Sequence, residues 1–155
     1  EIKTGYGLEP ELENKQLQAI TMLAERLSPD AVFATALAHV IPPKHREDRA
    51  GYITRFLDEV LEPAAASGLI RFCDVFVENT AYTPDETRRI AARAASLGIR
   101  MKLHVDQLHE GGGAALAAEL NALSADHLEK VSAAGRQRLA ECGVIATILP
   151  GLGTC

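Results

Sequence analysis

Hydrophobic and polar positions follow two different periods along this chain of 155 residues. Short unbroken apolar runs are typical of strands buried on both faces of a parallel sheet, whereas apolar residues three or four positions apart are typical of amphipathic helices. The pattern predicts six strands, at 1–3, 31–40, 72–77, 99–105, 122–126 and 144–149. It predicts five intervening helices, at 10–27, 46–66, 84–97, 114–120 and 129–142.

Several short motifs predict where these elements begin and end. Ser28-Pro29-Asp30 is expected to end the first helix, because proline and aspartate favour turns. Thr83-Pro84-Asp85-Glu86 has the sequence of a capping box, in which Thr83 is the N-cap and Glu86 its reciprocal partner.

Alternating strands and helices with short loops indicate a single α/β domain over residues 1–155, built on a parallel sheet with right-handed crossovers. Two architectures satisfy this pattern: an open doubly wound sheet, and part of a parallel (β/α)8 TIM-type barrel. The barrel needs eight strands, so six would leave it incomplete at both ends. The chain opens on strand sequence at Glu1 and closes on a Pro150-Gly151 turn, which favours the partial barrel slightly.

Composition narrows the classes of function. The net charge of −5, the 5% aromatic content and the lack of tryptophan disfavour a nucleic-acid partner. No apolar run approaches the roughly 18 residues of a membrane span, and no secretory signal precedes Glu1. Three cysteines without a C-x-x-C pair favour a reduced, cytoplasmic protein.

Ionisable residues gather at the predicted carboxyl ends of the strands, where α/β barrels keep their chemistry. Neutral imidazole suits Zn²⁺ or Fe, carboxylates complete such a shell, and metal-bound water is a natural nucleophile for hydrolysis. The residues at these ends are 4–6, His39, Glu78-Asn79, 104–107, Asp126-His127 and Pro150-Gly151.

Structural roles compete with these chemical ones. A single strand-end histidine is more often structural than a ligand, although three at separate strand ends weaken that alternative. Asp106 and Asp126 could cap turns or orient imidazoles, and His45 and His109 are expected to be solvated in charged loops. The glycines at 111–113 lack the lysine of a P-loop, which disfavours a phosphate cradle.

Several runs, in order along almost the whole chain, resemble the imidazolonepropionase family of the amidohydrolase superfamily. The resemblance implies a metal-dependent (β/α)8 barrel, of which this chain would supply about strands two to seven. The runs are 1–7, Ala38-His39-Val40-Ile41-Pro42-Pro43, Asp74-Val75-Phe76, 102–108, Gly112-Gly113-Ala114, 124–129 and Leu149-Pro150-Gly151.

The resemblance also implies an activity and a set of roles. The reaction is hydrolytic ring opening of 4-imidazolone-5-propanoate to N-formimidoyl-L-glutamate, a step in histidine degradation. By position, His104 would ligate one Zn or Fe ion, and His127 would polarise the attacked carbonyl or assist proton transfer. Tyr6, His39 and Gln107 would bind the substrate.

The chain departs from the family pattern in ways that matter. The His-x-His pair and the late-strand aspartate that complete the family's metal site do not occur here, so the remaining ligands are expected outside this segment, and the isolated chain should turn over little or no substrate. Three alternatives stay open: another cyclic-amide hydrolase or deaminase of the superfamily, a non-catalytic ligand-binding α/β module, and self-association, for example as a homodimer, through unpaired strand edges.

Overall fold

The computed structural model describes residues 1–27 and 32–151. Six parallel strands form one sheet in which each strand pairs with its neighbours in the chain, in the order β1-β2-β3-β4-β5-β6. A doubly wound sheet reverses its order at a switch point, so the sequential order excludes that alternative. The strands are β1 (Ile2–Lys3), β2 (Ala34–Ala38), β3 (Ile70–Val77), β4 (Arg100–Val105), β5 (Ser124–His127) and β6 (Ile145–Thr147).

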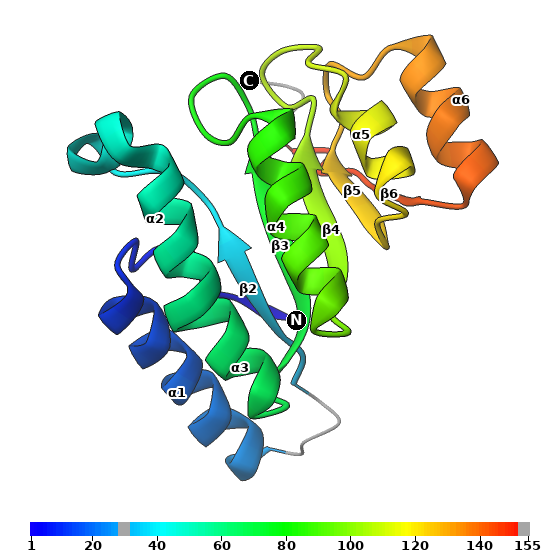
Figure 1. The fold of residues 1–155 in the computed structure, drawn as a ribbon. Coiled ribbons are helices and arrows are strands. Elements are labelled where there is room, and N and C mark those ends of the chain that lie inside the picture. The colour runs from blue at the N-terminus through cyan, green and yellow to red at the C-terminus, as the bar shows by residue number, and fades with distance from the viewer. Residues whose placement is uncertain (28–31, 152–155) are drawn as a thin grey trace.

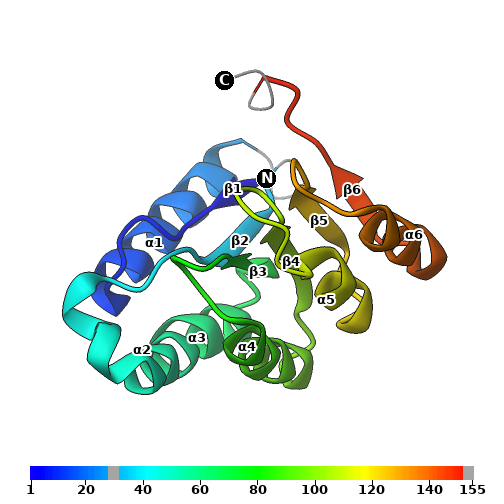
Figure 2. The same ribbon diagram turned by 90° about the horizontal axis from the view of Figure 1, so that it is seen from above.

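The sheet curls, and the helices lie along its convex side (Figures 1 and 2). Seen from above, the strands follow an arc with β1 near one end and β6 at the other, so the molecule is a partial barrel (Figure 2). The helices are α1 (Pro10–Arg26), α2 (Arg49–Arg55), α3 (Glu62–Ala66), α4 (Pro84–Ser96), α5 (Gly113–Glu119) and α6 (Ala133–Cys142). None of the helices in the described ranges combines the length and the apolar character needed to cross a bilayer.

Strand β4 shows how the sheet separates core from site. Successive side chains point to opposite faces of a strand, and Leu103 and Val105 are fully buried in the core beneath the helices. Gly113, at the start of α5, approaches so closely that a Cβ there would lie 2.4 Å from the Cβ of Val105. His104 therefore points to the concave face of the sheet, away from the core.

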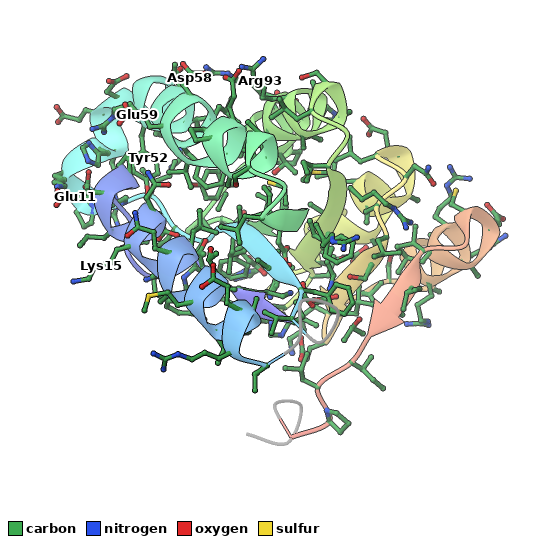
Figure 3. All side chains as sticks on the ribbon, turned by 90° about the horizontal axis from the view of Figure 1, so that it is seen from below. Glu11, Lys15, Tyr52, Asp58, Glu59 and Arg93 are labelled. Atoms are coloured by element: carbon green, nitrogen blue, oxygen red, sulfur yellow. The ribbon has the colours of Figure 1, made fainter. Side chains whose placement is uncertain are left out.

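The helix predicted at 46–66 is a run of four helical segments. A 3₁₀ turn (Pro43–Asp48) precedes α2, and a π-helical segment (Phe56–Leu61) joins α2 to α3. Pro63 explains the π segment, because proline has no N–H for the carbonyl of Glu59 four residues earlier. The Asn14 side chain of α1 donates to that carbonyl instead, at 2.9 Å. Figure 3 shows Glu59 beside α1, together with Tyr52, whose hydroxyl donates to Leu8 O at 2.7 Å.

Other boundaries shift by a few residues, and the capping box of Thr83 and Glu86 is confirmed. Helix α1 ends at Arg26; the turn predicted at 28–30 lies outside the described residues. The helical spacing of apolar residues at 12, 17, 20 and 23 predicts one buried face for α1, and this is partly wrong, because Leu12 and Leu23 are exposed while Glu13 is buried. The last helix begins after the N-cap Ser132, whose hydroxyl accepts from Gly135 N, and not at Glu129.

Candidate active site

A row of rings runs along the carboxyl ends of the first five strands. Tyr6 lies 4.9 Å from His39, and His39 lies 5.8 Å from Phe76, measured between ring centroids. Phe76 lies 6.5 Å from His104, and His104 lies 5.3 Å from His127. The structure therefore brings together four of the five predicted site residues, with Phe76 filling the gap between the two halves.

Phe76 was missed by the sequence analysis, although the pattern holds a signal for it. Val75 and Val77 face the core, so alternation places Phe76 on the concave face, and its register partner on β4 is His104. Phe76 thus lies between His39 and His104 in the row of rings.

Tyr6 is presented by a loop that a buried carboxylate holds in place. The Oε2 atom of Glu13 accepts from Gly5 N at 2.7 Å, and Oε1 accepts from Gly7 N and Leu8 N at 2.7 and 2.8 Å. Gly5 has a φ of +103°, and a Cβ there would lie 2.8 Å from Leu37. The loop is therefore closed over Glu13 while Tyr6 stays 71% exposed.

His104 belongs to a charged network on the concave face. Its Nδ1 lies 3.0 Å from Asp74 Oδ1, and the other oxygen of Asp74 accepts from Lys3 Nζ at 2.7 Å. Lys3 also donates to Asp126 Oδ2 at 3.1 Å, and Ser124 donates to Asp126 Oδ1 at 2.8 Å. The sequence did not assign Asp74 or Lys3 to the site, because a single charged residue in a predicted strand does not indicate which residue it pairs with.

The network shifts the ionisation of its members. Burial lowers the pKa of Lys3, but the attraction of Asp74 and Asp126 outweighs it, so the pKa is raised above its ordinary value. Burial likewise works to raise the pKa of Asp126, but Lys3 and the hydrogen bond from Ser124 hold it below its ordinary value. Asp126 therefore forms an ion pair with Lys3 and accepts a hydrogen bond from Ser124, and within the described residues no hydrogen bond joins it to an imidazole.

The glycine-rich loop after β4 is closed by Asp106. Its carboxylate accepts from Gly111 N and Gly113 N at 3.0 Å each and from Ala114 N at 2.9 Å. These amides are the donors that a phosphate cradle would offer, and Asp106 already engages them. The turn-capping role considered for Asp106 is thus confirmed.

Gln107 lies between two anchors. Asp106 precedes it, and Glu78 at the end of β3 accepts from Leu108 N and His109 N at 2.8 and 3.1 Å. Burial works to raise the pKa of Glu78, but these amide donors and the His109 imidazole lower it. Gln107 is half-buried and makes no hydrogen bond within the described part of the chain, so the structure holds its backbone but does not join its side chain to the row of rings.

The other two histidines are less free than expected. His45 is largely covered, stacks on Tyr52 at 5.1 Å and lies 2.9 Å from Glu9 Oε1. The expectation that it is solvated is therefore wrong, because the helical run after β2 brings it against Tyr52 and Glu9. His109 is mostly exposed, as expected, although its Nδ1 contacts Glu78.

His127 combines backbone strain with an unsatisfied buried atom. Its φ is +82° and that of Leu128 is +67°, a region that residues other than glycine rarely adopt. Its Nδ1 is buried 3.5 Å from Glu129 Oε1, without a hydrogen bond. Strain and unsatisfied polar groups of this kind concentrate at functional sites.

One residue of this site fits a metal ion well. In the described residues, His104 uses Nδ1 for Asp74 and has no hydrogen bond at Nε2, the arrangement typical of metal-ligating histidines. Donor atoms of Asp74, His104 and Asp126 also lie within 4.8 Å of one another, but the Lys3 ammonium contacts both carboxylates. A catalytic zinc site takes three protein ligands, and this chain offers His104 with the two aspartates already paired.

Comparison with known proteins identifies close relatives. No family model matches the chain. Imidazolonepropionases from Symbiobacterium thermophilum, Erwinia tasmaniensis and Myxococcus xanthus are 46%, 44% and 43% identical over 100%, 97% and 97% of this chain. The matched part is 36–37% of the length of these relatives. Over nearly all of its length, this chain is therefore similar to a segment that makes up about 37% of an imidazolonepropionase.

Proposed function

We propose that this chain is part of a metal-dependent hydrolase of the amidohydrolase type that opens the ring of 4-imidazolone-5-propanoate to give N-formimidoyl-L-glutamate. The observation that carries the proposal is the row of rings from Tyr6 to His127, in which His104 has no hydrogen bond at Nε2 within the described residues. The identity of 43–46% to imidazolonepropionases supports it.

Each member of the row receives a role. Tyr6, His39 and Gln107 bind the substrate. The ring of Phe76 forms an apolar wall between His39 and His104, against which the planar ring of the substrate packs. His127, which lies beside His104, donates a hydrogen bond or proton to the carbonyl oxygen as negative charge develops on it.

The proposal includes one Zn or Fe ion bound to His104, with its other protein ligands outside this segment. When bound, the ion would activate water as the nucleophile for hydrolysis. The contribution of this chain is to hold the imidazole of His104, to orient the ring of the substrate, and to place His127 at the attacked carbonyl. We assign the reaction to the cytoplasm; the free thiols of Cys73 and Cys142 accord with a reducing compartment.

A chimaera tests the proposal directly. This chain would replace the matching segment of the Symbiobacterium thermophilum imidazolonepropionase, and ring opening would be followed with 4-imidazolone-5-propanoate. We expect turnover by the chimaera and little or none by the isolated chain with added Zn²⁺. A folded, metal-loaded chimaera without turnover would refute the proposal, and a preference for another cyclic amide would redirect it to a different substrate.

Variants of the chimaera separate the roles. His127→Asn removes the imidazole but tolerates a positive φ, so we expect kcat to fall by about 10²–10⁴-fold with folding retained. His109→Asn, in the neighbouring loop, is the matched control and should leave kcat unchanged. Tyr6→Phe and His39→Ala should raise KM and spare the metal content; a loss of metal in either would contradict a substrate-binding role.

A further inference from the structure

A charged residue in the middle of a buried strand needs a reason. Asp74 lies within β3 and is fully buried. Burying a carboxylate is unfavourable unless charged and hydrogen-bonding partners compensate for its lost hydration. Both oxygens of Asp74 have such partners, Oδ1 on His104 Nδ1 and Oδ2 on Lys3 Nζ.

The geometry fixes which atom of His104 carries the proton. A carboxylate that accepts from an ammonium on one oxygen remains an acceptor on the other. His104 Nδ1 must then donate to Asp74, which leaves Nε2 with a free lone pair when the ring is neutral. The His104 side chain is 19% exposed, so a ligand on the concave face can reach the ring.

Lys3 decides between two uses of the same carboxylate. Asp74, His104 and Asp126 lie close enough to share a metal ion. The ammonium of Lys3 lies 2.7 Å from Asp74 and 3.1 Å from Asp126, so it takes the cation's place between them. Asp74 is therefore left to orient His104.

We propose that Asp74 is a positioning residue that holds His104 in the Nδ1-protonated tautomer and presents Nε2 as the ligand atom, with Lys3 as the counter-ion that keeps Asp74 an acceptor. The inference rests on the proposed function in one respect, namely that His104 binds the metal. The tautomer itself depends only on the contacts of this chain.

Long-range ¹H–¹⁵N spectra of the histidine-labelled chain test the tautomer without any ligand. At a pH where the imidazole is neutral, His104 should show a protonated Nδ1 and a bare Nε2. A protonated Nε2 in the unmodified chain overturns the proposal, whether or not any variant folds. Asp74→Asn, whose amide can also donate, should abolish the preference for one tautomer.

Asp126→Asn is the matched control. It removes the same charge from the same Lys3, but Asp126 does not bond His104. The tautomer should persist in this variant, and its loss there would mean that the charge of the network, and not the contact from Asp74, sets it.

Metal affinity in the chimaera gives the second readout. Zn²⁺ binding should weaken by about 10–100-fold in Asp74→Asn and much less in Asp126→Asn. Equal effects of the two variants would overturn the positioning role. A chimaera that shows this difference but hydrolyses no imidazolone would refute the proposed function alone, whereas an active chimaera with unchanged affinity in Asp74→Asn would refute the inference alone.

Discussion

Buried carboxylates act as backbone clamps for the loops of the candidate site. Glu13 accepts from three amides of the loop that carries Tyr6, and Glu78 and Asp106 accept from amides of the loop that follows Gln107. Each carboxylate accepts hydrogen bonds from backbone amides that would otherwise be buried without an acceptor. The positions of Tyr6 and Gln107 are thus set by acids that do not themselves join the row of rings.

The clamp at Glu13 leads to a prediction. Glu13→Gln replaces one acceptor oxygen by a donor nitrogen that faces amide donors, so we expect a loss of about 1–3 kcal/mol in the free energy of unfolding. Amide hydrogen exchange at Gly5, Gly7 and Leu8 should accelerate with it. Glu11→Gln, on the exposed side of the same helix turn, is the control (Figure 3); an equal loss in both variants would argue against the clamp.

At this scale the sequence predicts histidines better than acids. Strand-end position was enough to select His39, His104 and His127, because the ends of parallel strands share one edge. Glu13, Asp74 and Lys3 could not be selected in this way, since their burial depends on partners 5 to 123 residues away. From the sequence pattern alone, charged residues such as these are expected to be exposed to solvent.

Among the elements, the ion network ties strands that do not pair. Lys3 of β1 contacts Asp74 of β3 and Asp126 of β5, so one ammonium bridges the concave face across the arc. The alternation predicted the six strands and their order of alternation with helical segments, but not the exact bounds of those segments. It could not predict the π segment after α2, because that segment depends on how Asn14 of α1 takes the carbonyl released by Pro63.

This network should give the chain an acid-sensitive component of stability. The pKa of Asp126 is lowered on folding, so its contribution is present above its ordinary pKa of about 3.8 and is lost as the pH falls through the lowered value. In urea unfolding at decreasing pH, the free energy of unfolding should therefore decline less steeply for Asp126→Asn than for the unmodified chain. Asp85→Asn, an exposed aspartate on α4, should keep the original slope; if Asp126→Asn also keeps it, the ion pair does not contribute.

For the whole molecule, the two ends of the arc are the exposed features. Within the described residues, β1 pairs only with β2 and β6 only with β5. Ile145, Ile148 and Leu149 are exposed on and after β6. Unpaired edges with apolar side chains favour pairing with another chain.

We therefore expect the isolated chain to associate as its concentration rises. Light scattering should show an increasing mean mass, and Ile145→Lys with Ile148→Lys should reduce it. Met22→Lys, at an exposed apolar position on α1, is the control and should have little effect. A constant monomer mass for the unmodified chain would contradict the expectation.

The partial barrel itself was half predictable from the sequence. Six strands with intervening helices specify a parallel sheet, but the same pattern fits an open doubly wound sheet. The two folds differ in the order in which strands pair. That order cannot be inferred from the hydrophobic periodicity within a single strand.

The sequential order of the strands also bears on how the chain can be assembled. Each new strand needs only the strand before it as a template, so the sheet can grow in the order in which the ribosome releases the chain. Pairing between chain neighbours keeps the sequence separation of paired strands near the length of one βα unit, which is less than a sheet that pairs strands distant in the chain would need. Lys3 would then lack both partners until β3 and later β5 have been synthesised. Its contact with Asp126 would therefore form only after five strands have paired in register.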